Sequence, residues 1–179
     1  MIAACLLHDI GRKEQFEDPS LCHAQVGAEK ARTFLLENGF DSEFADRVAA
    51  CVRKHRYRSA SPPEKMEEKI LFDSDKLEAA GLMGIARSLL YEGKAGTPIY
   101  SLGSDFEVLD GTGNEPPSFF REYNFKLKKV YSGFYTSRVK KIAKARESAA
   151  AAFYEELLFE SRAVYSGKRI LSEYLESCF

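Results

Sequence analysis

DSEFADRVAACVRKH, residues 41–55, has the apolar period of an α-helix. Its apolar positions recur at intervals of three and four and end on a histidine; they are Phe44, Val48, Cys51, Val52 and His55. This spacing places all of them on one face of a helix. Asp41, just before them, is a residue type that caps helix N-termini. We therefore expect a helix whose buried stripe ends at His55.

Two neighbouring segments show the same period. One helix is expected to follow Ser20, a good N-cap, and to end before Gly39, with His23 directed at neighbouring residues. Another is expected to begin at Ser61, where the following proline suits a first turn, and to read on through Leu82. Apolar residues lie on more than one side of this segment, so its carboxylates need a partner or a metal ion.

The second half of the chain contains a region without a regular period. Glycine and proline interrupt any pattern over residues 92–118, which predicts a long loop. The apolar period of a helix returns over residues 119–179, with a break near Gly133. Since no segment alternates like a strand, we predict an all-α fold. The 179 residues suit a single domain, made of a core over residues 1–91, the loop and the C-terminal helices.

The charge balance excludes one class of partner. The chain has 26 Lys and Arg against 27 Asp and Glu, a formal net charge of −1, which argues against extended nucleic-acid binding. The opening apolar run, Ile2 to Leu7, is too short for a signal peptide or a membrane span. We expect a cytoplasmic protein with no membrane partner. The sequence does not indicate the oligomeric state.

The cysteines show no spacing typical of a metal knuckle or a disulfide framework. They are Cys5, Cys22, Cys51 and Cys178. We expect reduced and mostly buried thiols.

All three histidines, His8, His23 and His55, lie in the first third of the chain. His8 is followed directly by Asp9, and a mixed nitrogen and oxygen set suits Mn, Fe, Co, Ni or Zn better than Ca. A packed helical bundle could bring these groups together with Asp73 and Asp75. The residue types alone leave two interpretations equally open, a metal site and a set of hydrogen-bonded polar residues in the core.

Four segments, in this order, resemble the motifs of the HD-domain phosphohydrolases. They are Leu6–Arg12, with its His-Asp pair, Cys22–Ala24, Lys54–Arg58 and Asp73–Glu78. Members of this family are helical bundles that hold a divalent metal and cleave phosphate esters. The resemblance implies an HD-like all-α bundle and a metal-dependent phosphohydrolase.

The resemblance also implies roles for individual residues. The metal ligands would be His8, Asp9 and Asp75, with Mn, Mg, Co, Ni, Fe or Zn as the ion. Asp9, His23 and His55 would form the catalytic group, the two histidines acting as phosphate contacts, as acids or as ligands of a second ion. Asp73 is expected to be a buried carboxylate satisfied by nearby donors.

Basic residues lie in or beside three of these four motifs, which favours an anionic substrate. The candidates for substrate binding are Arg12, Lys54, Arg56, Arg58 and Lys76. The resemblance implies a small phosphorylated molecule, with a nucleotide as the first choice. Aromatic residues in or beside the loop could stack on a base, but we expect them to anchor the loop instead. These residues are Tyr100, Phe106, Phe119 and Phe120.

One feature departs from the family pattern. The family's first histidine lies one helix before the His-Asp motif, and this chain begins seven residues before His8. We expect a chain that lacks that helix, with a degenerate metal site as the alternative. Two further functions stay open: a non-catalytic module that binds a nucleotide or a protein partner, and a helical interaction protein that uses residues 149–175.

Overall fold

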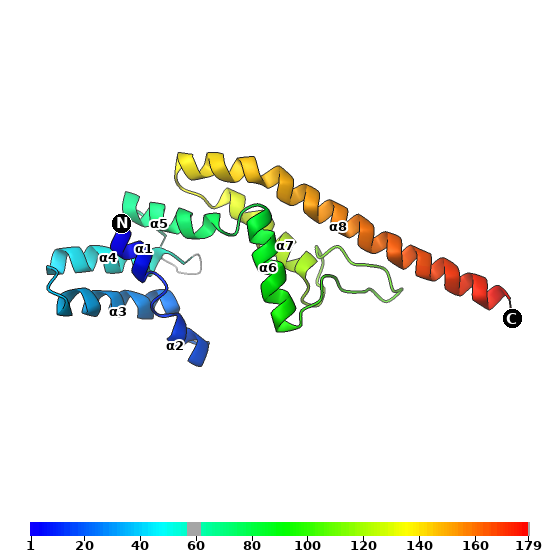
Figure 1. Ribbon diagram of the computed structural model, residues 1–179, viewed down its shortest axis with the longest axis horizontal. Helices are drawn as coiled ribbons and strands as arrows, with labels where there is room; N and C mark the ends of the chain where they lie inside the picture. The colour runs from blue at the N-terminus through cyan, green and yellow to red at the C-terminus, as the bar shows by residue number, and fades with distance from the viewer. Residues whose placement is uncertain (57–61, 179) are drawn as a thin grey trace. The chain divides into compact units, whose positions relative to one another are not determined.

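The computed structural model describes residues 1–56 and 62–178, without the side chains of residues 167–169 (Figure 1). Of the described residues, 69% are helical. Within the described ranges the only strand-like pairing is one isolated bridge between Leu102 and Val108. The predicted all-α fold is confirmed.

The chain divides into two compact units, residues 1–76 and residues 77–179. Each unit has its own buried apolar cluster. The prediction that residues 1–179 form a single domain stays a prediction. The first unit contains all three histidines and two of the motif aspartates, Asp9 and Asp75.

The first unit is built from α1 (Ile2–Leu7), α2 (Arg12–Glu17), α3 (His23–Glu37), α4 (Ser42–Lys54) and α5 (Met66–Leu77). Helices α3 and α4 lie side by side (Figure 1), and alanines at the contact allow their backbones to approach closely. The predicted start of α4 is confirmed, because Asp41 Oδ1 accepts a hydrogen bond of 2.8 Å from the backbone N–H of Phe44. His55, the last residue of the stripe, is 1% exposed.

Helix α3 begins later than predicted. Ser20 is not its cap, because the backbone N–H and the hydroxyl of Ser20 both donate to Asp18 Oδ1 in a local turn. Cys22 takes the N-cap position instead. His23 is therefore the first residue of α3, a position that matters for its hydrogen bonding.

Helix α5 also begins later, at Met66, and the predicted start at Ser61 lies outside the described residues. The carboxylate of Glu68 accepts hydrogen bonds from the backbone N–H groups of Glu64 and Lys65, at 2.8 and 3.1 Å. It thereby satisfies amide groups that the first turn leaves without a partner. Lys54 on α4 adds an ion pair to the same carboxylate at 3.1 Å.

The helix predicted to reach Leu82 is in fact two helices. Helix α5 ends at Leu77 and α6 (Leu82–Ala95) follows, because Gly81 has a φ of +79° that interrupts the helix. The long loop begins after Gly96 rather than at residue 92, since Gly96 ends α6 in the left-handed conformation.

The second unit contains α6, α7 (Phe119–Phe125), the 3-10 helix η1 (Leu127–Ser132) and α8 (Ser137–Ser177). Phe119 and Phe120 are fully buried, so they anchor the loop as expected. Tyr100 packs against Phe120 with ring centroids 6.1 Å apart. Phe106 is 72% exposed and does not serve as an anchor. No helix in the described ranges has a stretch apolar enough to cross a membrane.

The expectation of mostly buried thiols is wrong. All four cysteines are free, but only Cys51 is buried, whereas Cys5 and Cys178 are exposed and Cys22 is partly exposed. Cys5 is exposed because the short helix α1 packs through Ala3, Ala4 and Leu7, which leaves the opposite side in solvent.

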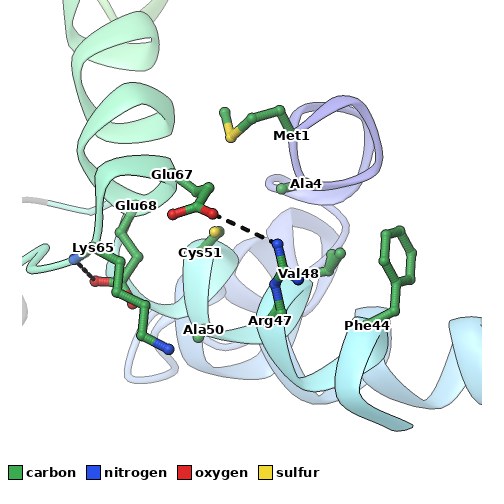
Figure 2. A pocket seen from close by; sticks show the side chains of 10 residues that line it. All are labelled: Met1, Ala4, Phe44, Arg47, Val48, Ala50, Cys51, Lys65, Glu67 and Glu68. Carbon is green, nitrogen blue, oxygen red and sulfur yellow. Dashed lines mark hydrogen bonds and ion pairs between the residues drawn. The ribbon is translucent and has the colours of Figure 1, made fainter. Parts of the chain in front are cut away.

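A shallow pocket lies between α1, α4 and the start of α5 (Figure 2). Met1, Ala4 and Val48 supply apolar lining, and an ion pair between Arg47 and Glu67, at 3.6 Å, lies at its edge. None of the predicted site residues lines this pocket.

The carboxylate of Glu68 is expected to stabilise the fold in a pH-dependent way. Burial raises its pKa, but the two backbone N–H groups and Lys54 more than offset this, so the pKa lies below its ordinary value. The carboxylate therefore stabilises the fold fully at neutral pH, and the stabilisation is lost as the pH falls through the lowered pKa. We expect Glu68→Gln to lower the free energy of unfolding by about 2 kcal/mol at pH 7 and by less below pH ~4, measured by urea unfolding.

Glu67→Gln is the matched control. Its carboxylate is 45% exposed and forms a surface ion pair with Arg47, so its loss should cost less than about 1 kcal/mol. An equal loss for the two variants would contradict the role assigned to Glu68.

Candidate metal centre

The turn between α1 and α2 carries His8 and Asp9 directly onto the start of α3. Gly11 makes this approach possible: a Cβ atom there would lie 2.4 Å from the carbonyl oxygen of His23 and 2.6 Å from the nitrogen of Gly27. The φ of Gly11 is −92°, so glycine is needed for the close contact rather than for an unusual backbone conformation. Any side chain at this position would push Asp9 away from His23.

Asp9, His23 and His55 converge on one point. Asp9 Oδ1 lies 3.6 Å from the Nε2 atom of each histidine, and the two Nε2 atoms are 3.2 Å apart. The ligand atoms of these three residues all lie within 4.8 Å of one another, the only such group found in the described part of the chain. His23 and His55 are 3% and 1% exposed.

The other oxygen of Asp9 faces a second set. Asp9 Oδ2 lies 3.5 Å from His8 Nε2, which in turn lies 3.9 Å from Asp75 Oδ1. The structure thus brings together His8, Asp9 and Asp75, the ligands that the family resemblance implies. They lie next to the group formed with His23 and His55. Asp9 is the residue that the two sets share.

Two of the histidines are held by the ends of their own helices. His8 and His55 are the C-cap residues of α1 and α4. Their Nδ1 atoms lie 2.7 Å from the carbonyl oxygen of Cys5 and 2.5 Å from that of Val52. A carbonyl oxygen can only accept, so each Nδ1 carries the proton and donates it, and each Nε2 lone pair is left free for the centre.

Burial keeps the two innermost histidines neutral. Burial lowers the pKa of His23 to about 4, and the positive charge of Arg12 contributes. Burial likewise lowers the pKa of His55. The pKa of Asp9 also lies below its ordinary value, since Arg12 more than offsets the upward effect of burial. At neutral pH the centre therefore combines a carboxylate with neutral imidazoles.

These groups fit a divalent cation. Asp9 Oδ1 is buried and has no hydrogen-bond partner; the Nε atom of Arg12 lies 2.9 Å away, but as an ion pair without hydrogen-bond geometry. The Nε2 atoms of two neutral histidines, His23 and His55, face the same space. Electron-pair donors that face one another without a proton between them are stabilised by a cation, and imidazole and carboxylate are common ligands of Mn, Fe, Co, Ni and Zn.

The basic candidates divide into two groups. Arg12 contacts Asp9, and the ammonium of Lys76 lies 2.5 Å from Asp75 Oδ2, so both adjoin the centre. Lys54 pairs with Glu68 and Glu64 at the start of α5 instead.

The remaining candidates from the sequence are Arg56, Arg58 and Asp73. Arg56 donates to the Sγ atom of Cys22 at 3.6 Å. Arg58 lies outside the described residues. Asp73 is fully buried, as the sequence predicted.

One residue at the centre carried no sequence signal. Gln15 places its Oε1 atom 2.6 Å from His23 Nδ1. It belongs to none of the four motif segments, and its contact depends on the packing of α2 against α3.

Comparison with known proteins agrees with this geometry. Residues 1–80 match the family model of the HD domain. Among curated proteins, YpgQ of Bacillus subtilis is 27% identical over 127 residues, which are 69% of this chain and 56% of YpgQ. The chain thus spans little more than half the length of this relative.

Solved structures share the fold. A predicted HD superfamily hydrolase from an uncultured Thermotogales bacterium has a TM-score of 0.56 at 29% identity, covering 89% of this chain and 66% of that one. An HD-superfamily hydrolase from Bacillus thuringiensis has a TM-score of 0.62 at 25% identity, covering 90% and 72%. YpgQ in complex with ADP has a TM-score of 0.58 at 19% identity, covering 89% and 85%.

The contact at Gly11 can be tested by adding one methyl group. We expect Gly11→Ala to lower the free energy of unfolding by about 1–3 kcal/mol, because the new Cβ overlaps backbone atoms of α3 that cannot move independently. Gly93→Ala in α6 is the control, since a Cβ there meets nothing within 4 Å and should stabilise the helix by up to about 1 kcal/mol. Urea unfolding of both variants measures the difference, and an unchanged stability of Gly11→Ala would contradict the close contact.

Proposed function

We propose that this chain is a metal-dependent phosphohydrolase of the HD-domain superfamily, because residues 1–80 match the family model of the HD domain and solved HD-superfamily hydrolases share the fold. The proposed substrate is a small phosphorylated molecule, with a nucleotide as the first class. One observation supports this most directly: Asp9 Oδ1, paired with the exposed guanidinium of Arg12, lies 3.6 Å from the Nε2 atoms of two buried, neutral histidines.

The geometry offers two adjoining places for a cation. One is formed by Asp9 Oδ1, His23 and His55, and the other by Asp9 Oδ2, His8 and Asp75. A divalent ion held there would lower the pKa of a bound water molecule and polarise a phosphoryl oxygen. A carboxylate with two oxygens can serve both places, so the arrangement is compatible with one ion or two.

The low pKa of His23 favours a ligand role over an acid role. With a pKa of about 4 the ring of His23 is neutral at neutral pH, so it has no second proton to give up as a general acid. A neutral imidazole keeps a lone pair on one of its nitrogens and can bind a cation through it. The same argument holds for His55, whose pKa is lowered by burial.

Arg12 and Lys76 are the best placed cations for the phosphate. Their charged groups already contact Asp9 and Asp75, and the side chain of Arg12 is 56% exposed. With a cation bound at Asp9, the guanidinium of Arg12 would be free to hold phosphate oxygens in bidentate fashion. Lys54 is less suited, because its ammonium pairs with the buried carboxylate of Glu68.

A nucleotide is proposed because YpgQ, which shares the fold, has been solved with ADP. The alternative is a non-catalytic HD module, which would bind a nucleotide or a protein partner without turnover. Apolar residues exposed along the second half of α8 favour a protein-binding role for that helix; they are Phe159, Val164, Ile170, Leu171, Tyr174 and Leu175.

Metal binding gives the first test. At a Mn²⁺ concentration 100 times its dissociation constant we expect the free energy of unfolding to rise by about 2.7 kcal/mol. Asp9→Asn should abolish this increase, because it removes the charge shared by both places. Asp46→Asn, which removes a surface carboxylate paired with Arg32, should keep it. Urea unfolding with and without Mn²⁺ measures the effect, and equal stabilisation of wild type and Asp9→Asn would argue against the centre.

Turnover gives the second test. We expect the chain to release phosphate or pyrophosphate from ADP, ATP or a simple phosphomonoester in the presence of Mn²⁺, and chelation or Asp9→Ala to reduce release to background. Colorimetric detection of both products identifies the bond that is cleaved. No release with any divalent metal, or release unchanged in Asp9→Ala, would refute the phosphohydrolase. Binding of ADP without release would support the non-catalytic module.

A further inference from the structure

The histidines of the centre differ in how their Nδ1 atoms are held. His8 and His55 donate to backbone carbonyls at the C-terminal ends of their own helices. His23 is the first residue of α3, where a helix presents unsatisfied N–H groups and no carbonyl of its own to accept a proton. The acceptor for His23 Nδ1 must therefore come from elsewhere.

Gln15 on α2 supplies that acceptor. Its Oε1 atom lies 2.6 Å from His23 Nδ1, and its Nε2 atom donates to the carbonyl oxygen of Leu21 at 3.1 Å. Since the carbonyl of Leu21 can only accept, the NH₂ end of the amide faces it and the oxygen end faces the histidine. The contact with Leu21 thus sets the orientation of the amide.

An amide oxygen also can only accept, so the neutral ring of His23 must carry its proton on Nδ1. Its Nε2 lone pair then faces Asp9 Oδ1 at 3.6 Å and His55 Nε2 at 3.2 Å. In the other tautomer an N–H would occupy this direction. That N–H could donate to either neighbour, and it would block a cation.

We infer that Gln15 is a positioning residue that selects the cation-binding tautomer of His23. This inference rests on the proposed metal site for its purpose, but the tautomer itself is a property of the metal-free protein. Of the three groups that accept a hydrogen bond from a histidine Nδ1, only Gln15 is a side chain. It is therefore the one that a substitution can remove. No step of the proposed hydrolysis requires Gln15 to touch the substrate.

A purely structural role is the competing explanation. Gln15 links α2 to Leu21 and could merely fasten the segment before α3. Such a role predicts reduced stability for any substitution of Gln15, but it predicts no change in the protonated nitrogen of His23. The nitrogen that carries the proton therefore distinguishes the two explanations.

Side-chain ¹⁵N NMR of the metal-free chain at pH 7 shows directly which ring nitrogen of His23 carries the proton. We expect His23 of the wild type to be protonated on Nδ1. Gln15→Leu should shift the population towards the Nε2–H form, because the acceptor at Nδ1 is lost while Asp9 and His55 remain as acceptors at Nε2. Gln15→Glu retains an acceptor oxygen and should restore the Nδ1–H form, although it loses the bond to Leu21. Gln25→Leu, at an exposed position of α3, is the control and should leave the tautomer unchanged.

Calorimetric titration with Mn²⁺ alone supplies a second readout. We expect Gln15→Leu to weaken binding by about 10-fold or more and Gln15→Glu to bind within a few fold of wild type. A His23 tautomer that is the same in wild type and Gln15→Leu would overturn the inference, whatever the metal affinity. Absence of Mn²⁺ binding by the wild type would refute the proposed metal site, while the NMR result would still decide the role of Gln15.

Discussion

The close contact of Gly11 with the first turn of α3 is the constraint on which the centre depends. The backbone of the turn after α1 lies against the carbonyl of His23 and the nitrogen of Gly27, with no room for a side chain. This contact brings Asp9 within 3.6 Å of His23, and the packing of α4 on α3 brings His55 to the same point. The centre is therefore assembled by backbone packing, and the polar groups follow.

The polar groups that are brought together would repel one another in the absence of a cation. A carboxylate and two neutral imidazoles share a buried space, and the protons of the imidazoles are held on the far side of the rings by oxygen acceptors. Burial disfavours the charged form of the histidines, so their protonation does not relieve this repulsion at neutral pH. A divalent ion bound between these groups would accept electron pairs from all of them. This is the physical reason why the residue set suits an ion-dependent hydrolase.

Several local features were predictable from the sequence because local energetics decide them. The Asp41 cap, the stripe that ends at His55, the helical fold class and the burial of Asp73 all follow from residue type and period. Helix boundaries near competing hydrogen bonds were not predictable. Ser20 bonds to Asp18 rather than capping α3, and Glu68 sets the start of α5 through amides that come before it. The break at Gly81 replaced one expected helix by two, since glycine adopts a positive φ without cost.

The sequence by itself determined which chemical groups could meet: three histidines and the motif aspartates, on segments with an inward face. Only the tertiary structure decided that Asp9 is the shared group, that Lys54 serves the start of α5, and that Gln15 holds His23. The reason is physical. Helix period depends on neighbours three or four residues away, whereas these contacts join side chains that lie 8 to 46 residues apart and depend on how closely separate backbones can pack.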